Sequence, residues 1–384
     1  MPATDDSRTH RDAAVFTDRL LISFSPDVSD DDVRDFFAAI AQMNLFERAQ
    51  GIMDETTFFP RLRVAVTPIP YEFLAAHQSV LEERGMKSFD RERVSFLPEA
   101  IAPTKNAIPQ DPLAAMKVLA SHSMGKGVTI AMLDGGFDVG HPDFDPKRFS
   151  PHPLPNLPLG KPGAHGTHGA GLAAGPLLPA NGTTPRYGVA SEAFVTLTRV
   201  LARSGAFDEY VLFGIEQAMM QGADIVCMCI GTPVPNGDPY SQPFEDAVAV
   251  ASKKMLLIAA AGNAPDGQIH GVEHPANCPS VMAVAALDDQ LREWDLSCRE
   301  TDPTQEVNVA APGYELLSSL PGASYGRRSD TSPATACVAG IAALWAQTDA
   351  NLRGAALKAQ IEGACVSHGM DPRRAGRGLV QAPP

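Results

Sequence analysis

The sequence of 384 residues contains no long apolar run, and this argues against a membrane-spanning helix. Such a helix needs about 20 consecutive apolar residues. The longest apolar runs here, such as residues 256–261, have only the length of a strand. The first six residues, MPATDD, also lack the basic start and apolar segment of a secretory signal peptide. The sequence therefore predicts a cytoplasmic protein with no membrane partner.

Positive charge is scarce as well. The chain has 31 Lys and Arg residues against 45 Asp and Glu residues, which gives a formal net charge of −14. Proteins that bind nucleic acids gather Lys and Arg on one face, because these side chains contact the phosphates. We therefore expect no nucleic-acid partner.

Repeated cysteine spacing is the third missing feature. The six cysteines show no regular pattern, and in a chain without a signal peptide they are expected to be reduced thiols. Cys227 and Cys229 would face the same side of a strand, which is compatible with half of a metal site. No second pair matches them, so buried, small apolar side chains are the favoured interpretation.

What the sequence does contain is enough apolar material for two folded units, since a single core rarely serves more than about 300 residues. Residues 1–15 are polar and are expected to form a flexible tail. Residues 16–97 predict a small α+β domain of ferredoxin-like order, β-α-β-β-α-β. Residues 98–112 hold four prolines and predict a linker. Residues 113–384 form the second predicted domain.

Short apolar strands alternate with helices through the second domain. This alternation is typical of an α/β fold, in which helices cover both faces of a parallel sheet. Polar residues often follow the strands directly, and open α/β sheets place their sites at the carboxyl ends of strands. The expected strands are residues 128–133, 194–200, 225–230, 256–261 and 281–285.

Two acid–base candidates stand out in this domain. Asp134 ends an apolar strand, so it either terminates the strand or orients a histidine from a buried position. His165 stands at the start of a helix rich in small residues and suits a general base. Because His168 follows three residues later, a metal site is the alternative, but no Glu beside them and no third ligand support it.

Two further candidates concern the acyl-transfer step. Asn263 follows the apolar run 256–261 and is either a turn residue or an amide donor to a developing oxyanion. Ser332 precedes Pro333 and a run of small apolar residues, so it is either a helix cap or a nucleophile in the positive field of a helix N-terminus.

The four candidates occur in local sequences that resemble one family, the subtilisin-like serine proteases. The resemblance covers about residues 109–384. It rests on Gly125-Lys-Gly-Val-Thr-Ile-Ala-Met-Leu-Asp134, His141-Pro-Asp-Phe144, His165-Gly-Thr-His168, Gly188-Val-Ala190, Ala260-Ala-Gly-Asn263, His274-Pro-Ala276, Ala311-Pro-Gly313 and Thr331-Ser332 ahead of Val338-Ala-Gly340.

The resemblance implies a serine endopeptidase that cleaves peptide or protein substrates and needs no cofactor for its chemistry. Ser332 would be the nucleophile of an acyl-enzyme, and His165 the general base and then the general acid. Asp134 would orient His165, and Asn263 would donate to the oxyanion. The segment Cys229-Ile230-Gly231 matches the substrate-binding strand, where the family typically has Ser-Leu-Gly.

Two residues near the serine depart from the family pattern. Asp330 stands where the family usually has glycine, and Ala336 where it usually has proline. A carboxylate two residues from the nucleophile would raise the pKa of His165 or crowd the substrate, although Asp also suits a helix start. The alternative hypothesis is therefore a catalytically impaired, peptide-binding module with the same fold.

The resemblance also suggests roles outside the triad. The N-terminal domain resembles the family's propeptide in position, size and pattern, which implies a folding aid and an intramolecular inhibitor with residues 97–103 in the substrate cleft. A permanent accessory domain is the alternative. Asp143 matches a calcium ligand of many members, and residues 180–184 offer further oxygens. Asp143 can equally be a solvated turn acid.

Overall fold

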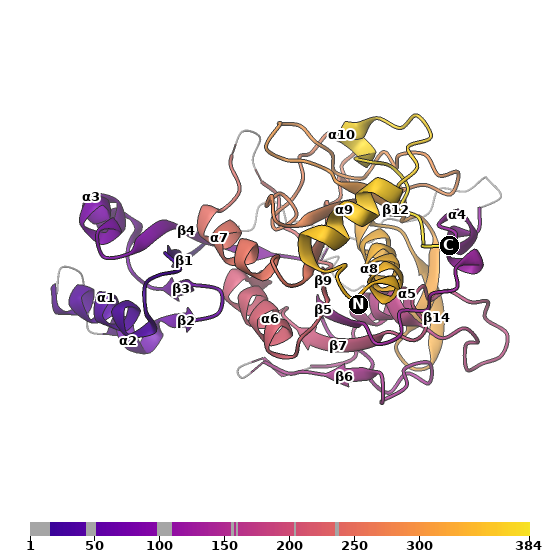
Figure 1. Ribbon diagram of the computed structural model, residues 1–384, viewed down its shortest axis with the longest axis horizontal. Helices are drawn as coiled ribbons and strands as arrows, with labels where there is room; N and C mark the ends of the chain where they lie inside the picture. The colour runs from indigo at the N-terminus through magenta and orange to yellow at the C-terminus, as the bar shows by residue number, and fades with distance from the viewer. Residues whose placement is uncertain are drawn as a thin grey trace, which may run out of the picture.

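The computed structural model forms two lobes, a smaller N-terminal one and a larger one that holds the C-terminus (Figure 1). It describes residues 16–43, 51–97, 110–154, 157–158, 160–202, 205–234 and 238–384. The predicted tail, residues 1–15, and residues 98–109 of the predicted linker lie outside these ranges.

The smaller lobe has the predicted β-α-β-β-α-β order, with one short helix added. Its strands form an antiparallel sheet in the order β2-β3-β1-β4, and the helices lie on the side of this sheet that faces away from the larger lobe (Figure 1). The elements are β1 (Phe16–Phe24), α1 (Asp30–Met43), α2 (Ile52–Glu55), β2 (Thr57–Phe59), β3 (Val64–Thr67), α3 (Tyr71–Glu82) and β4 (Met86–Ser95).

Helix α1 shows why this lobe folds as the sequence predicts. The Ser29 hydroxyl accepts a hydrogen bond from the Asp32 N–H at 3.1 Å, and the Asp32 carboxylate accepts from the Ser29 N–H at 3.0 Å. This reciprocal arrangement satisfies two backbone donors at the helix start. Val33, Phe36 and Ile40 then lie on one buried face of the helix.

The larger lobe is built on a parallel sheet of seven strands in the order β12-β11-β10-β9-β5-β7-β6. The predicted α/β class is therefore confirmed, and β6 and β12 extend the sheet beyond the five expected strands. Its strands are β5 (Thr129–Asp134), β6 (Phe149–Pro151), β7 (Phe194–Arg199), β9 (Ile225–Met228), β10 (Leu256–Ala260), β11 (Met282–Leu287) and β12 (Val309–Pro312).

The remaining elements surround this sheet. A two-stranded antiparallel hairpin, β13 (Leu316–Leu320) and β14 (Ser324–Arg328), packs against α5. The helices are α4 (Pro112–Ala115), the 3₁₀ turn η2 (Val118–Ala120), α5 (Ala164–Ala174), α6 (Asp208–Met220), α7 (Gln242–Ala251), α8 (Thr331–Thr348), α9 (Gly354–Ala364) and α10 (Pro372–Ala375).

Helix α8 runs through the centre of the larger lobe and is almost wholly buried (Figure 1). It packs against α5 and against five strands of the sheet, β5 and β9 to β12. Its small side chains permit this close packing. At Gly340, for example, an added Cβ would lie 2.5 Å from the Val189 Cβ, so no larger residue fits. The packing fixes the N-terminus of α8, where Ser332 lies.

The two lobes share an extensive interface in which the sheet of the smaller lobe covers α6 and α7 (Figure 1). The rings of Phe59 and Phe213 meet edge to face with their centroids 4.8 Å apart. Arg19 and Glu209 form an ion pair at 2.6 Å, and the Glu92 carboxylate accepts from the Glu209 N–H at the start of α6. A carboxylate in that position stabilises the helix N-terminus.

Among the described residues, no helix is long and apolar enough to cross a membrane.

All six cysteines are free thiols, and the Sγ atoms of Cys227 and Cys229 lie 3.7 Å apart in the buried sheet. In the described part of the chain, no group of three or more His, Cys, Asp or Glu side chains is placed to hold a metal ion. Cys227 and Cys229 are both fully buried.

Candidate active site

Asp134 and His165 are in direct contact. Asp134 is the last residue of β5 and is fully buried, and both of its carboxylate oxygens lie 2.9 Å from Nδ1 of His165 in the first turn of α5. One oxygen also accepts from the Gly135 N–H at 2.5 Å. With Nδ1–H donating to this carboxylate, Nε2 is left as the basic nitrogen of the neutral imidazole.

The electrostatic environment favours a protonated His165. Burial alone would lower the pKa of this imidazole, but the Asp134 carboxylate and its hydrogen bond, together with the charge of Asp330, raise the pKa above its ordinary value of 6.5. A positive charge formed on His165 during a reaction would therefore be stabilised where it forms.

His168 has a different environment. Its Nε2 lies 2.9 Å from the Leu316 carbonyl oxygen, and burial lowers the pKa of His168 to about 3. Since a hydrogen bond to a carbonyl requires Nε2–H to be the donor, this nitrogen is occupied. His165 and His168 therefore have separate partners instead of converging on one metal ion.

Ser332 is the second residue of α8, the helix that packs against the His165 helix α5. The Ser332 Oγ and the His165 Nε2 are both buried, and neither makes a hydrogen bond to another described residue. Helices α5 and α8 pack together, and the carboxylate of Asp330, two residues before Ser332, acts electrostatically on His165. The Ser332 Oγ and the His165 Nε2 thus lie buried on two helices that pack together.

Asn263 follows β10 and is anchored to the start of α8. Its Oδ1 accepts a hydrogen bond from the Thr331 N–H at 3.1 Å, and its side chain is buried. The amide oxygen accepts from the residue before Ser332, and the amide nitrogen is the donor end of the same side chain. The side chain therefore suits the donor role that the sequence predicts.

Asp330 caps α8 from within the site. Its Oδ1 accepts a hydrogen bond from the Ser332 N–H at 2.7 Å, and the residue is fully buried. Its Oδ2 lies 3.9 Å from Nε of Arg328. Ala336 has a simpler environment, because it is buried on α8 where that helix faces Gly169 of α5.

An extended segment of the smaller lobe lies between two parts of the larger one. The Phe96 N–H donates to the Gly231 carbonyl at 2.7 Å, and the Gly231 N–H donates back at 2.9 Å. On its other side, the end of β4 pairs with the two-residue strand β8 (Ala206–Phe207). Leu97, the next residue, lies beside Gly135, which follows Asp134. The segment thus runs toward the candidate triad.

Of the predicted substrate-binding residues, Gly231 alone is seen in this backbone pairing. Cys229 and Ile230 are fully buried. The Cys229 Sγ lies 3.6 Å from the Ser332 carbonyl oxygen, and interaction with Cys227 and burial raise the pKa of the Cys229 thiol well above its ordinary value. The Cys229 side chain therefore contacts the first turn of α8.

Comparison with known proteins identifies the family. The model of the subtilase family matches residues 125–378, which is more than half of the chain. The chain belongs to the subtilase family of serine proteases.

Named relatives agree with this assignment. Subtilisin E of Bacillus subtilis is 29% identical over 282 residues, which cover 71% of this chain and 71% of the relative. The intracellular serine protease of Paenibacillus polymyxa is 30% identical over 274 residues, covering 68% of this chain and 80% of the relative. This subtilase is therefore a serine protease that acts on peptide substrates.

Solved structures show the same fold. Fervidolysin of Fervidobacterium pennivorans, a keratinolytic enzyme related to subtilisin, superposes with a TM-score of 0.71 at 20% identity, over 95% of this chain and 60% of that one. The prenylagaramide maturation protease PagA superposes with a TM-score of 0.58 at 27% identity, over 70% of this chain and 95% of that one.

Sequence reasoning missed two features beside the site of this subtilase. Strand β8 is only two residues long, too short to show any periodicity. Glu273 lies against Gly231 and Gly262, since a Cβ added to either glycine would approach its carboxyl group within 2.4 Å. Its position directly before His274-Pro-Ala276, a sequence typical of the family, was the available signal.

The surroundings of Asp143 do not fit a calcium ion. One carboxylate oxygen accepts from the Ala180 N–H at 2.6 Å and the other from the Tyr187 hydroxyl at 2.5 Å. In the loop of residues 180–184, the Asn181 Oδ1 accepts from the N–H groups of Thr183 and Thr184. Calcium needs six to eight oxygen ligands, whereas here hydrogen-bond donors take both oxygens of the key carboxylate.

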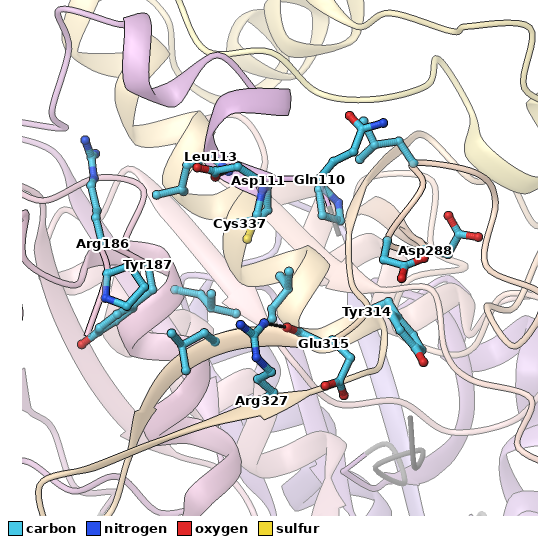
Figure 2. A pocket seen from close by; sticks show the side chains of 18 residues that line it. Gln110, Asp111, Leu113, Arg186, Tyr187, Asp288, Tyr314, Glu315, Arg327 and Cys337 are labelled. Atoms are coloured by element: carbon cyan, nitrogen blue, oxygen red, sulfur yellow. Dashed lines mark hydrogen bonds between the residues drawn. The ribbon is translucent and has the colours of Figure 1, made fainter. Parts of the chain in front are cut away.

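A separate pocket of about 150 Å³ lies elsewhere in the larger lobe (Figure 2). It is bordered by Tyr187, Tyr314 and Cys337, and by Arg327, which donates to the Glu315 carbonyl. None of the three triad candidates lines it. Residues 94–97 do not line it either, so it is distinct from the segment that runs toward the triad.

Proposed function

We propose that this subtilase hydrolyses peptide bonds through an acyl-enzyme on Ser332, with His165 as general base and Asp134 orienting it. The observation that carries the proposal is the contact of both Asp134 carboxylate oxygens with His165 Nδ1, at 2.9 Å, on a helix that packs against α8, where the Ser332 hydroxyl is buried. This arrangement leaves Nε2 of His165 free to take a proton from Ser332.

The reaction then follows from the positions of these groups. His165 Nε2 accepts the Ser332 proton while Oγ attacks the peptide carbonyl, and the negative charge forms on the carbonyl oxygen. The Asn263 amide donates to that oxygen. The imidazolium next gives its proton to the leaving amine, and water, activated by the same base, hydrolyses the ester. No cofactor takes part in these steps.

The N-terminal domain is proposed as a folding aid and inhibitor, which makes the intact chain a zymogen. Residues 94–97 support this role, because they are extended and pair with β8 on one side and Gly231 on the other. A peptide substrate would need the same backbone groups. The relative from Paenibacillus polymyxa, an intracellular serine protease, supports a cytoplasmic location for the enzyme.

The alternative, a module that binds peptides without cleaving them, rests on Asp330. Its carboxylate holds the Ser332 N–H at 2.7 Å, and that N–H would otherwise be available to the oxyanion. Incubation of a peptide library with the chain freed of its N-terminal domain after folding, and with its Ser332→Ala form treated alike, followed by mass spectrometry, separates the two proposals. Products that depend on Ser332 support hydrolysis, and their absence supports the binding module.

Inhibition by the N-terminal domain predicts the effect of one backbone substitution. Phe96→Pro removes the N–H that donates to Gly231, and the loss of one such bond corresponds to about 1 kcal/mol. We expect the uncleaved variant to hydrolyse a fluorogenic peptide about fivefold faster than the wild type. Phe96→Ala, which keeps the N–H, is the control. Equal rates for Phe96→Pro and the wild type would contradict inhibition by this segment.

The oxyanion role of Asn263 predicts a loss in kcat. We expect Asn263→Ala to lower kcat by about 10²- to 10³-fold with little change in KM, because the donor acts on charge that develops in the transition state. Steady-state kinetics on one peptide measures both constants. Asn308→Ala is the matched control, since Asn308 is also buried and its Oδ1 also accepts a backbone N–H, at 2.7 Å. If both variants lose kcat equally, Asn263 has only a structural role.

A further inference from the structure

The feature that the proposed mechanism does not use is the carboxylate of Asp330. It is fully buried at the start of α8, directly beside the candidate nucleophile. Its backbone is held in place, because the Asp330 N–H donates to the Gly313 carbonyl at 3.0 Å and an added Cβ on Gly313 would lie 2.8 Å from the Asp330 carbonyl oxygen. Only its side chain is therefore free to change position.

The hydrogen bond that Asp330 makes competes with catalysis. The Ser332 N–H points to Oδ1 of Asp330 at 2.7 Å, the length of a strong, charge-assisted hydrogen bond. In an acyl transfer at Ser332, a preorganised N–H at this position would stabilise the oxyanion of the substrate. One N–H cannot form a strong hydrogen bond to the Asp330 carboxylate and to the oxyanion at the same time. A carboxylate this close also repels negative charge that develops on the substrate.

The groups around Asp330 come from three elements. His165 on α5 and Arg328 on β14 face it with positive or potentially positive charge, and the Cys229 Sγ, after β9, lies 3.6 Å from the Ser332 carbonyl oxygen. Burial raises the pKa of the Asp330 carboxyl, while His165, Arg328 and the hydrogen bond from the Ser332 N–H oppose this rise. Asp330 in turn contributes to the raised pKa of His165, after Asp134.

We propose that Asp330 is a positioning residue that holds the Ser332 N–H away from the oxyanion, so that this subtilase turns over only when the hydrogen bond is exchanged for one to the substrate. The inference rests on the proposed function of Ser332. It assigns to Asp330 a restraint on kcat that a glycine, the residue usual in the family, would not impose.

The test is a kinetic comparison of Asp330→Gly, Asp330→Asn and the wild type at Asp330, with Ser332→Ala as the inactive reference, all in chains that also carry Phe96→Pro to weaken inhibition by the N-terminal domain. Removing the carboxylate frees one oxyanion donor, and we expect kcat of Asp330→Gly to rise about tenfold or more with KM little changed. Asp330→Asn keeps an oxygen that can accept the N–H but removes the charge. It should raise kcat less and move the acid limb of the pH–rate profile to lower pH, because His165 then loses a stabilising charge.

If Asp330 served only as a helix cap, its removal would not raise kcat. Asp371 caps α10 in the same way, accepting from the Arg373 N–H at 3.0 Å, and Asp371→Gly is the matched control for the loss of a cap. If Asp330→Gly folds poorly, Asp330→Ser retains a capping oxygen without the charge and replaces it in the comparison. A kcat of Asp330→Gly or Asp330→Ser no higher than that of the wild type overturns the inference. A wild type as inactive as Ser332→Ala, together with inactive Asp330 variants, instead overturns the proposed function.

Discussion

Replacing Ser332 with alanine is expected to reduce kcat for peptide hydrolysis by about 10⁶-fold. The reason is that Oγ is the only group that the proposed mechanism uses as a nucleophile, and His165 cannot act without it. Residual turnover above the uncatalysed rate would come from binding and from the oxyanion donors. The measurement is initial-rate kinetics on a fluorogenic peptide with enzyme that has the wild-type melting temperature.

A neighbouring serine provides the control for this variant. Ser329 is buried three residues earlier, and its Oγ accepts from the Glu315 N–H at 2.9 Å. Ser329→Ala therefore removes a buried hydroxyl from the same segment without touching the proposed nucleophile. It should retain kcat within a few-fold, and Ser332→Ala with the activity of Ser329→Ala would exclude Ser332 as nucleophile.

Replacing Asp134 with asparagine has the second largest expected effect, a loss of about 10⁴-fold in kcat. The fold should persist, since an amide has nearly the same shape as the carboxylate. However, an amide NH₂ facing Nδ1 favours the tautomer that carries its proton on Nε2, and the negative charge that stabilises the imidazolium is gone. The pKa of His165 should fall with it, which can be followed by NMR of the imidazole.

A second buried Asp–His pair in this protein provides the control for Asp134→Asn. Asp208 and His274 also contact each other, with Oδ1 3.0 Å from Nε2, and both residues are buried. Asp208→Asn should cost stability and weaken the contact with the Arg93 N–H of the N-terminal domain. It should not approach the loss in kcat seen for Asp134→Asn. Equal losses would mean that any buried Asp–His pair in this fold affects activity indirectly.

The fold was largely predictable because its signals are local. Parallel strands covered on both faces are continuous apolar runs, so β5 and β10 can be recognised within single segments. Each of these strands ends at or just before a polar residue, Asp134 or Asn263, and the carboxyl edge of the sheet brings both close to the start of α8. Chain order and strand direction therefore contained most of the information about the site.

The features that could not be predicted depend on contacts between distant segments. The pairing of Phe96 with Gly231 joins the two lobes, and no periodicity marks either residue. The hydrogen bond from Ser332 to Asp330 depends on a side-chain rotamer, although the substitution itself was visible in the sequence. At Asp143, the sequence offered oxygen atoms, whereas the fold placed the Ala180 N–H and the Tyr187 hydroxyl against them.

The most direct test of the account is covalent labelling of the nucleophile. Purified Phe96→Pro chain, in which the substrate cleft is expected to open more readily, is treated with a fluorophosphonate probe and analysed by intact mass and peptide mapping. The account predicts one adduct, on Ser332, which disappears in the variant that also carries Ser332→Ala. No adduct, or an adduct on a different residue such as Ser329, would contradict it.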